Sequence, residues 1–222
     1  MFANFDSIKI INLPRRTDRR RQMEQELKRV GLQGDPRVSF YAARSFDDAG
    51  SFYSIGARGC YDSHLSILKE AAQNGHSVLI VEDDCDFEPR AAVYELPDDW
   101  QIFYGGYGPD WVKKPETSNH IEGSHLMGFR ADTVPILADF LEQLLSRDDH
   151  PSVDGAYMWF RREHPKVRSH FAVPCIGNQR QSQTDVGERR FFDRTPGLRE
   201  AASAARRLKR WLKRRRIPTL SP

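Results

Sequence analysis

The feature that most constrains this chain is a short apolar run that passes directly into a cluster of acids. Residues 77–81 have the sequence SVLIV, and residues 82–86 follow at once as EDDCD. A short, continuous apolar run is typical of a strand covered on both faces, as in a parallel sheet packed between helices. Open α/β sheets bind ligands in the crevice outside the carboxyl ends of their strands, which is where this run places its acids. The run therefore predicts a fold class and the position of a site together.

Strand-like and helix-like segments alternate along most of the chain. Strands are predicted at 7–13, 37–42, 77–81, 100–104, 125–129 and 167–173, and helices at 18–30, 58–73, 137–145 and 153–161. Thr17 or Asp18 is the expected N-cap of the first helix, residues 44–56 are expected to form a loop, and Gly105 is expected to end the fourth strand. The alternation predicts a single α/β domain with a mainly parallel central sheet and helices on both faces.

The composition is that of one folded domain. With 222 residues, 39% of them hydrophobic and 11% aromatic, the chain can bury one substantial core, which excludes global disorder. It has no apolar stretch near the roughly 18 residues of a membrane span and no secretory signal pattern at its start. Its three cysteines are too few and too scattered for a disulfide framework or a cysteine-rich zinc site. We therefore expect a cytoplasmic protein.

The basic charge belongs to one end of the chain. The net charge is +3, yet residues 199–216 alone contain nine Arg or Lys against one Glu. We expect a domain at 1–186 followed by a polar linker and basic tail at 187–222. Leucines and alanines recur at helical spacing in 197–216, so this tail is predicted to lie as an amphipathic helix on an anionic membrane surface; a solubilising tail is the alternative. Charge confined to one end argues against a nucleic-acid-binding protein.

The acidic run has the composition of a site for a hard divalent ion. Neighbouring carboxylates repel each other by about 1 kcal/mol per close pair even in water, and a cation relieves this cost. Oxygen-only ligands favour Mn²⁺ or Mg²⁺, which also accept oxygens from a substrate diphosphate. Asp84 is the first predicted ligand, with Asp86 and Glu82 on the same side if the strand continues, while Asp83 is expected to meet ribose or sugar hydroxyls. A solvated acidic loop is the alternative.

A second set of candidate residues follows the first predicted strand. Asn12, Leu13, Arg15 and Arg19 lie at its carboxyl end and at the start of the next helix. Amide donors and positive charge at a helix N-terminus attract phosphate, so these residues are predicted nucleotide contacts. The alternative for the arginines is a solvated helix face.

Three segments together resemble glycosyltransferase family 25, which contains lipopolysaccharide-type and collagen-type galactosyltransferases. They are 10–20 (IINLPRRTDRR), 59–65 (GCYDSHL) and 78–84 (VLIVEDD), and weaker matches at 125–130, 153–154 and 183–186 extend the likeness to about residue 186. The chain departs from the family at 56–58, where GAR stands in place of Gly-Glu-Ile, and this difference bears on the choice of donor.

The resemblance implies a GT-A-like, metal-dependent hexosyltransferase. Its donor would be a UDP-sugar, carrying galactose or a related hexose, and its acceptor a saccharide or lipid-linked saccharide in lipopolysaccharide or surface-polysaccharide synthesis. If the family's inversion of configuration holds, a carboxylate must accept the acceptor's proton; Asp154 is the first candidate and Asp185 the second. Asp154 as a helix N-cap is the alternative, and His64 is predicted to be a packed core histidine. The rival functions are a catalytically lapsed glycosyltransferase-like binding domain and a metal-dependent phosphohydrolase.

Overall fold

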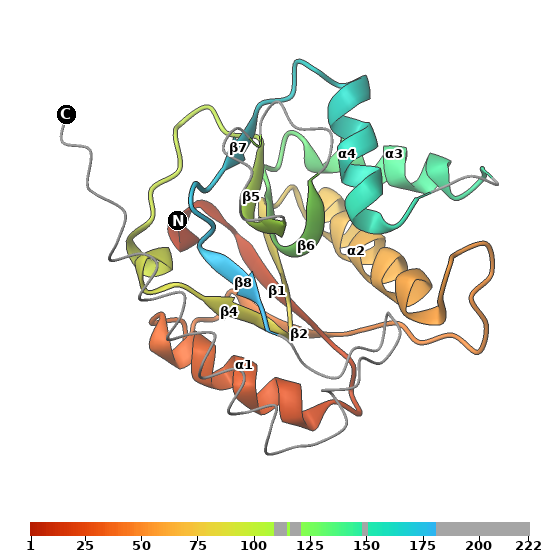
Figure 1. Cartoon of the computed structure of the whole chain (residues 1–222). Helices are drawn as coiled ribbons and strands as arrows, with labels where there is room; N and C mark the ends of the chain where they lie inside the picture. Colours follow the sequence, from red (N-terminus) through yellow and green to blue (C-terminus); the bar gives the residue numbers. More distant parts are fainter. Residues whose placement is uncertain (109–114, 116–120, 148–150, 181–222) are drawn as a thin grey trace. The chain divides into compact units, whose positions relative to one another are not determined.

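The computed structural model describes residues 1–108, 115, 121–147 and 151–180 (Figure 1). The chain divides into two units, Met1–Gln179 and Arg180–Pro222, and the described helices and strands all belong to the first. Asp185, the predicted linker and tail at 187–222 and the amphipathic helix at 197–216 lie outside the described residues. None of the described helices is long and apolar enough to cross a membrane.

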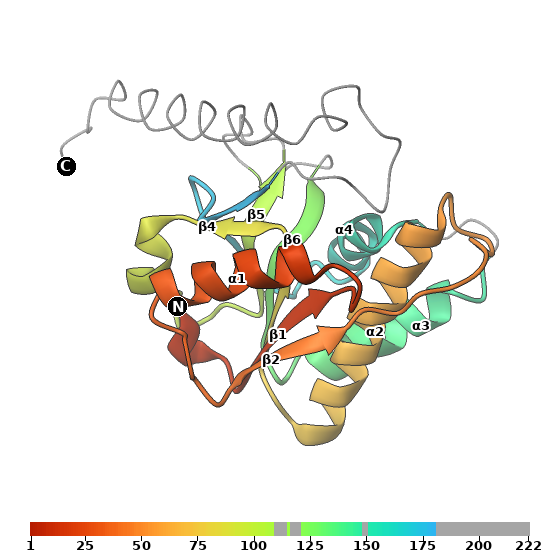
Figure 2. The ribbon, with the colours of Figure 1, turned by 90° about the horizontal axis from the view of Figure 1, so that it is seen from below.

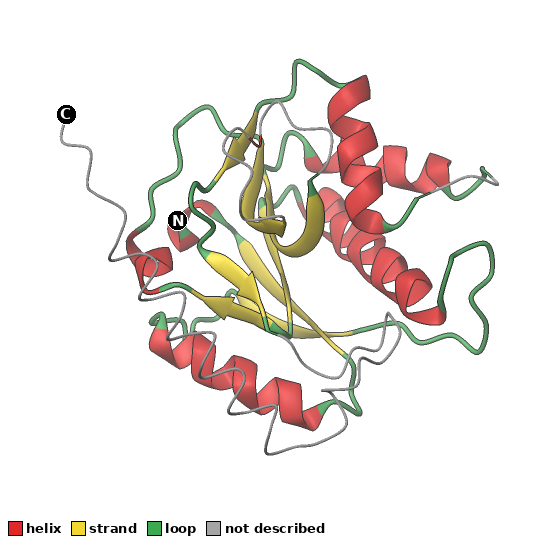
Figure 3. Cartoon of the chain, in the orientation of Figure 1, coloured by secondary structure: helices red, strands yellow, loops and turns green. Residues whose placement is uncertain are grey.

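A six-stranded mixed sheet forms the centre of the first unit (Figure 3). Its order is β2 (Val38–Ala42), β1 (Ser7–Asn12), β3 (Val78–Glu82), β6 (Glu122–Phe129), β5 (Ile102–Gly108) and β7 (Ser169–Phe171). Strand β6 is antiparallel to both of its neighbours, whereas β1 pairs in parallel with β2 and β3, and β5 with β7. The prediction of an α/β fold with a mainly parallel sheet is confirmed.

Helices cover both faces of this sheet (Figure 2). Helix α1 (Thr17–Arg29) packs on one face, and α2 (Ile55–Asn74), α3 (Val134–Leu144) and α4 (Val153–Glu163) pack on the other. The side chains of β3 alternate between the two cores: Leu79 and Val81 join the core of α1, and Val78 and Ile80 join the core of α2–α4. All four are fully buried, as expected for a strand covered on both faces.

Several short elements complete the unit. Strands β4 (Cys85–Phe87) and β8 (Gly177–Gln179) form a separate antiparallel pair, and 3₁₀ helices occupy Phe2–Asn4 and Pro89–Val93. None of these four elements was predicted. The β4–β8 pair matters for the site because β4 begins inside the acidic run.

The ends of three elements differ from the predictions for local reasons. The N-cap of α1 is Arg16, so the predicted caps Thr17 and Asp18 lie inside the helix, where the carboxylate of Asp18 accepts the Arg16 Nε–H at 2.9 Å. Helix α2 begins at Ile55, three residues before the predicted start, because the Ser54 hydroxyl oxygen accepts the Ala57 N–H at 3.1 Å.

The third difference is that β5 runs through Gly105 and Gly106 to Gly108 instead of ending at Gly105. Here the glycines serve close packing. A Cβ at Gly105 would lie 2.7 Å from Leu126 Cδ2, and a Cβ at Gly106 would lie 2.3 Å from His125 Nε2. Because these side chains are missing, β6 can approach β5 closely, and the pairing of β5 with β6 continues past the two glycines.

Candidate active site

The acidic run divides at a turn. Glu82 is the last residue of β3, Asp83 and Asp84 form the turn, and β4 starts at Cys85. Strand geometry therefore does not persist through the run. The expectation that Asp84, Asp86 and Glu82 share one side by strand alternation is wrong in its premise, because alternation stops at Glu82.

Asp83 and Asp84 both contact helix α1. Asp83 Oδ2 accepts the Asn12 amide N–H at 2.7 Å, and Asp83 Oδ1 accepts an N–H from Arg19 Nη1 at 2.7 Å. The same Arg19 nitrogen lies 3.2 Å from Asp84 Oδ2. Asn12, Arg19, Asp83 and Asp84 are all buried. The buried guanidinium of Arg19 thus neutralises part of the charge of the acidic run. The sequence predicted that a metal ion supplies this positive charge.

The other predicted nucleotide contacts stand nearby in the turn after β1. Leu13 is half-buried, and its carbonyl accepts the Arg16 N–H at 2.8 Å, while Arg15 is exposed. The structure therefore brings Asn12 and Arg19 against the acids and leaves Arg15 at the surface beside them.

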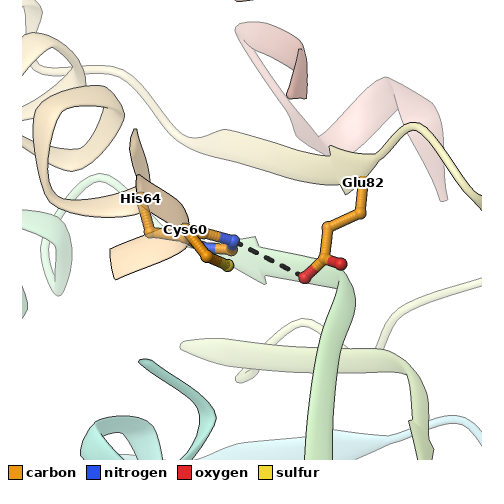
Figure 4. Close-up of side chains that lie close together, drawn as sticks. All are labelled: Cys60, His64 and Glu82. Atoms are coloured by element: carbon orange, nitrogen blue, oxygen red, sulfur yellow. Dashed lines mark ion pairs between the residues drawn. The ribbon is translucent and has the colours of Figure 1, made fainter. Parts of the chain in front are cut away.

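Glu82 faces the opposite core. Its Oε1 accepts the Ser124 hydroxyl at 2.6 Å and lies 3.8 Å from His64 Nε2. Figure 4 shows Cys60 and His64 extending from α2 toward this carboxylate. On the far side of the ring, His64 Nδ1 lies 2.8 Å from the Tyr157 hydroxyl of α4. His64 is fully buried and hydrogen-bonded, which confirms its prediction as a packed histidine.

The groups around Glu82 keep it ionised. Burial alone would raise the pKa of Glu82, but the imidazole of His64, 3.8 Å away, and the Ser124 hydroxyl outweigh burial and lower the pKa to about 2. Burial raises the pKa of the Cys60 thiol well above its ordinary value, and the carboxylates of Glu82, Asp154 and Asp84 raise it further. Of these carboxylates, that of Glu82 lies within 4.8 Å of the thiol sulfur.

Asp154 lies in the first turn of α4. Its Oδ2 accepts the Gly123 N–H at 3.1 Å, and its Oδ1 accepts the Gly155 N–H at 3.0 Å and the Ser152 hydroxyl. The N-cap of α4 is Ser152, so the alternative reading of Asp154 as that cap is wrong. The pKa of Tyr53, in the loop before α2, is raised by partial burial of its hydroxyl and, to a smaller extent, by the charge of Asp154.

Sequence reasoning missed Ser124, Tyr157 and Cys60 as neighbours of the acids. The usable signal was the spacing of Cys60 and His64, since residues four apart share one face of a helix. No local signal pointed to Ser124 or Tyr157, because they reach Glu82 and His64 from 42 and 93 residues away in the chain.

The donor atoms define what the site can hold. Among the described residues, Cys60, His64 and Glu82 form the one group of three candidate ligands whose atoms all lie within 4.8 Å of one another. Asp84, in the turn, and Asp86, in β4, therefore belong to no described group of three ligands at that range. Two carboxylates still suit Mn²⁺ or Mg²⁺, because such ions keep waters and take diphosphate oxygens to complete their coordination.

The topology and these acids define an α/β protein with a carboxylate-rich site at the carboxyl end of its central strand. No protein-family model matches the sequence. Procollagen galactosyltransferase 1 of Danio rerio is 29% identical over an alignment of 141 residues that covers 51% of this chain and 23% of that protein. Procollagen galactosyltransferase 2 of Homo sapiens is 30% identical over an alignment of 139 residues that covers 50% of this chain and 22% of that protein.

The chain is thus a distant homologue of the procollagen galactosyltransferases over half of its length, and the predicted resemblance is confirmed. It spans less than a quarter of the length of either relative. Among solved structures, a glycosyltransferase involved in the glycosylation of the major capsid of PBCV-1 aligns with a TM-score of 0.47 and 10% identity, over 78% of this chain and 93% of that one. A Drosophila galactosyltransferase 7 mutant in complex with manganese, UDP-Gal and xylobiose aligns with a TM-score of 0.46 and 9% identity, over 87% and 79%.

Proposed function

We propose that this chain is a glycosyltransferase that moves a hexose from a nucleotide diphosphate to a saccharide acceptor with the help of Mn²⁺ or Mg²⁺. The observation that carries the proposal is the pair of buried carboxylates Asp83 and Asp84 in the turn directly after β3, at the carboxyl end of that strand. This is the edge where α/β sheets bind their ligands. The distant homology supports the class, and the names of the two relatives make galactose the sugar to test first.

Asp84 and Asp86 are the residues that would hold the ion. Their donors are all oxygen, which matches the preference of Mn²⁺ and Mg²⁺. Such an ion stabilises negative charge on a departing nucleoside diphosphate. With Arg19 Nη1 3.2 Å from Asp84 Oδ2, the carboxylate is already oriented before any ligand binds.

Asn12, Leu13, Arg15 and Arg19 would bind the nucleotide half of the donor. Arg15 is exposed at the turn after β1, where a guanidinium can meet a phosphate. Asn12 and Arg19 hold Asp83 at 2.7 Å each, and in this reading they position Asp83 for the ribose or sugar hydroxyls. Glu82, kept ionised by His64 and Ser124, would accept hydrogen bonds from the donor sugar.

Asp154 would accept the proton of the attacking hydroxyl, with Asp185 as the second candidate. One oxygen of Asp154 accepts hydrogen bonds from Ser152 and Gly155, which fixes the rotamer of the carboxylate. The second oxygen accepts the Gly123 N–H at 3.1 Å, and its other lone pair would take the proton, which requires an approach within about 3 Å. Asp154→Asn keeps the size and polarity of the side chain but removes its basicity. Transfer should fall by about 10²–10⁴-fold without loss of folding.

The acceptor and the cellular setting are further parts of the proposal. We place the acceptor among saccharides and lipid-linked saccharides of lipopolysaccharide or surface-polysaccharide synthesis, at the cytoplasmic face of a membrane. The basic segment 197–216 would hold the enzyme there through anionic headgroups. Loss of liposome association on deleting residues 197–222 is the expected result, and unchanged association would remove the membrane contact from the proposal.

The decisive experiment measures thermal unfolding with UDP, GDP and ADP, each with and without Mn²⁺. A ligand that binds the folded state raises the unfolding temperature by mass action, so UDP with Mn²⁺ should raise it most. Asp84→Asn should abolish the metal-dependent part, whereas Asp139→Asn, at an exposed position of α3, should preserve it. Hydrolysis of phosphate esters without a sugar acceptor would favour the phosphohydrolase, and no metal-dependent nucleotide binding at all would favour the lapsed domain.

A further inference from the structure

Cys60, His64 and Glu82 bring three different metal-ligand types to one point. Cys60 and His64 lie four residues apart on α2, and Glu82 ends β3 opposite them (Figure 4). The thiol sulfur, an imidazole nitrogen and a carboxylate oxygen all lie within 4.8 Å of one another. This set differs from the oxygen-only pair Asp84 and Asp86 in containing sulfur and nitrogen.

His64 is oriented as a metal-binding histidine is. Its ring is fully buried, and Nδ1 lies 2.8 Å from the Tyr157 hydroxyl. Among the described residues, Nε2 has no hydrogen-bond partner, and its nearest polar contact is Glu82 Oε1 at 3.8 Å. Metal-binding histidines hold one ring nitrogen with a protein partner and direct the other at the ion. When Nδ1–H donates to the Tyr157 oxygen, the lone pair of Nε2 points at Glu82 and Cys60.

The dimensions match those of a small tetrahedral ion. Zinc binds sulfur at about 2.3 Å and nitrogen or oxygen at about 2.0–2.2 Å, so tetrahedral ligand atoms lie about 3.4–3.6 Å apart. The nitrogen–oxygen distance of 3.8 Å is close to this spacing, and small side-chain rotations bring the sulfur into range. The Ser124 hydroxyl, which donates to Glu82 Oε1 at 2.6 Å, would hold the carboxylate in position for the ion.

We propose that Cys60, His64 and Glu82 form a second metal site that takes Zn²⁺ or another divalent ion with affinity for sulfur, separate from the Mn²⁺ or Mg²⁺ bound with the nucleotide. Thiolate and imidazole ligands select Zn²⁺ over Mg²⁺ and Mn²⁺. On binding, the Cys60 sulfur forms a bond to the ion and its proton passes to solvent. The carboxylate of Glu82 lies within 4.8 Å of the thiol sulfur, and its negative charge favours a cation there. The fourth position is left for water.

Cobalt(II) tests the site because it replaces zinc and reports on its ligands. The full chain, stripped of metal and kept in excess Mg²⁺ to occupy oxygen-only sites, is titrated with Co²⁺ while absorption is recorded. We expect one Co²⁺ per chain with thiolate-to-cobalt charge-transfer absorption, and displacement by Zn²⁺. Cys60→Ser should lose this absorption, and Cys175→Ser, which removes another thiol of the same unit, should keep it.

Two further variants keep the test valid if Cys60→Ser folds poorly. Tyr157→Phe removes only the hydroxyl that orients His64 and should weaken Co²⁺ binding by about tenfold or more. Glu82→Gln should weaken it while preserving the charge-transfer absorption. Absence of that absorption in the wild type, or its survival in Cys60→Ser, would overturn the proposal. The titration uses no nucleotide or sugar, so its result is independent of whether the transferase proposal holds.

Discussion

The two sides of the β3 carboxyl end stabilise their carboxylates in different ways. Asp83, in the turn after β3, faces α1 and is paired with Arg19 at 2.7 Å. Glu82, with the parity of Val78 and Ile80, faces α2 and is held by the Ser124 hydroxyl and His64. One side therefore neutralises charge with a buried guanidinium, and the other keeps a carboxylate ionised with polar neighbours. The first arrangement is suited to holding the fold together, and the second leaves a reactive group accessible.

The largest effect is expected on the α1 side. Arg19→Met leaves Asp83 buried without its cation, and breaking a buried pair from one side costs about 3–5 kcal/mol. Arg21→Met, at an exposed position of the same helix, should change stability by less than about 0.5 kcal/mol. The free energy of unfolding in urea measures both. A cost for Arg19→Met no larger than for Arg21→Met would show that the Arg19–Asp83 pair does not hold α1 to the sheet.

The next effect concerns Glu82 and pH. Because the pKa of Glu82 falls from 4.5 to about 2 on folding, its ionised form stabilises the protein at any pH above 4.5. This contribution, of the order of 3 kcal/mol, should be lost progressively as pH falls from 4.5 toward 2. Glu82→Gln should remove that part of the pH dependence. The free energy of unfolding in urea, measured between pH 7 and pH 3, tests this prediction. Glu142→Gln, at an exposed position of α3, is the control.

If Glu82→Gln left the pH dependence of the free energy of unfolding unchanged, the proposed difference between the two sides of β3 would be contradicted. It would mean that Glu82 titrates alike in the folded and unfolded chain and that His64 and Ser124 do not act on it. The acid-labile part of the stability would then have to come from other pairs, such as Asp18 with Arg16, which lowers the pKa of Asp18 to about 2.

How far the sequence predicts this site depends on how local each contact is. The apolar run 77–81 predicted β3, and strand alternation places Glu82, its last residue, on the same face as Val78 and Ile80. The turn at Asp83 and Asp84 was not predictable in the same way, because it depends on Arg19, 64 residues earlier in the chain. Strands β4 and β8 were missed because three-residue strands carry no period, and their pairing joins Cys85 to Gln179.

A smaller effect tests the support behind His64. Tyr157→Phe leaves Nδ1 of a fully buried ring without its hydroxyl partner, which should cost about 2 kcal/mol. Tyr53→Phe removes a hydroxyl from a residue that is 71% exposed and should cost less than about 0.5 kcal/mol. Thermal or urea unfolding of the two variants makes the comparison. Equal costs would indicate that the hydroxyl of Tyr157 contributes nothing to the orientation of His64.

The smallest effect separates charge from packing at Ser124. Its hydroxyl donates to Glu82 Oε1 at 2.6 Å, so Ser124→Ala should cost about 1 kcal/mol at neutral pH. The hydroxyl stabilises the charged form of Glu82, so its removal raises the pKa of Glu82, and the cost should shrink as pH falls below 4.5. Ser146→Ala, whose exposed hydroxyl donates to the Gln143 carbonyl at 2.7 Å, should show no such pH dependence. A cost for Ser124→Ala that stays constant with pH would assign Ser124 to packing, and Glu82 would then owe its ionisation to His64.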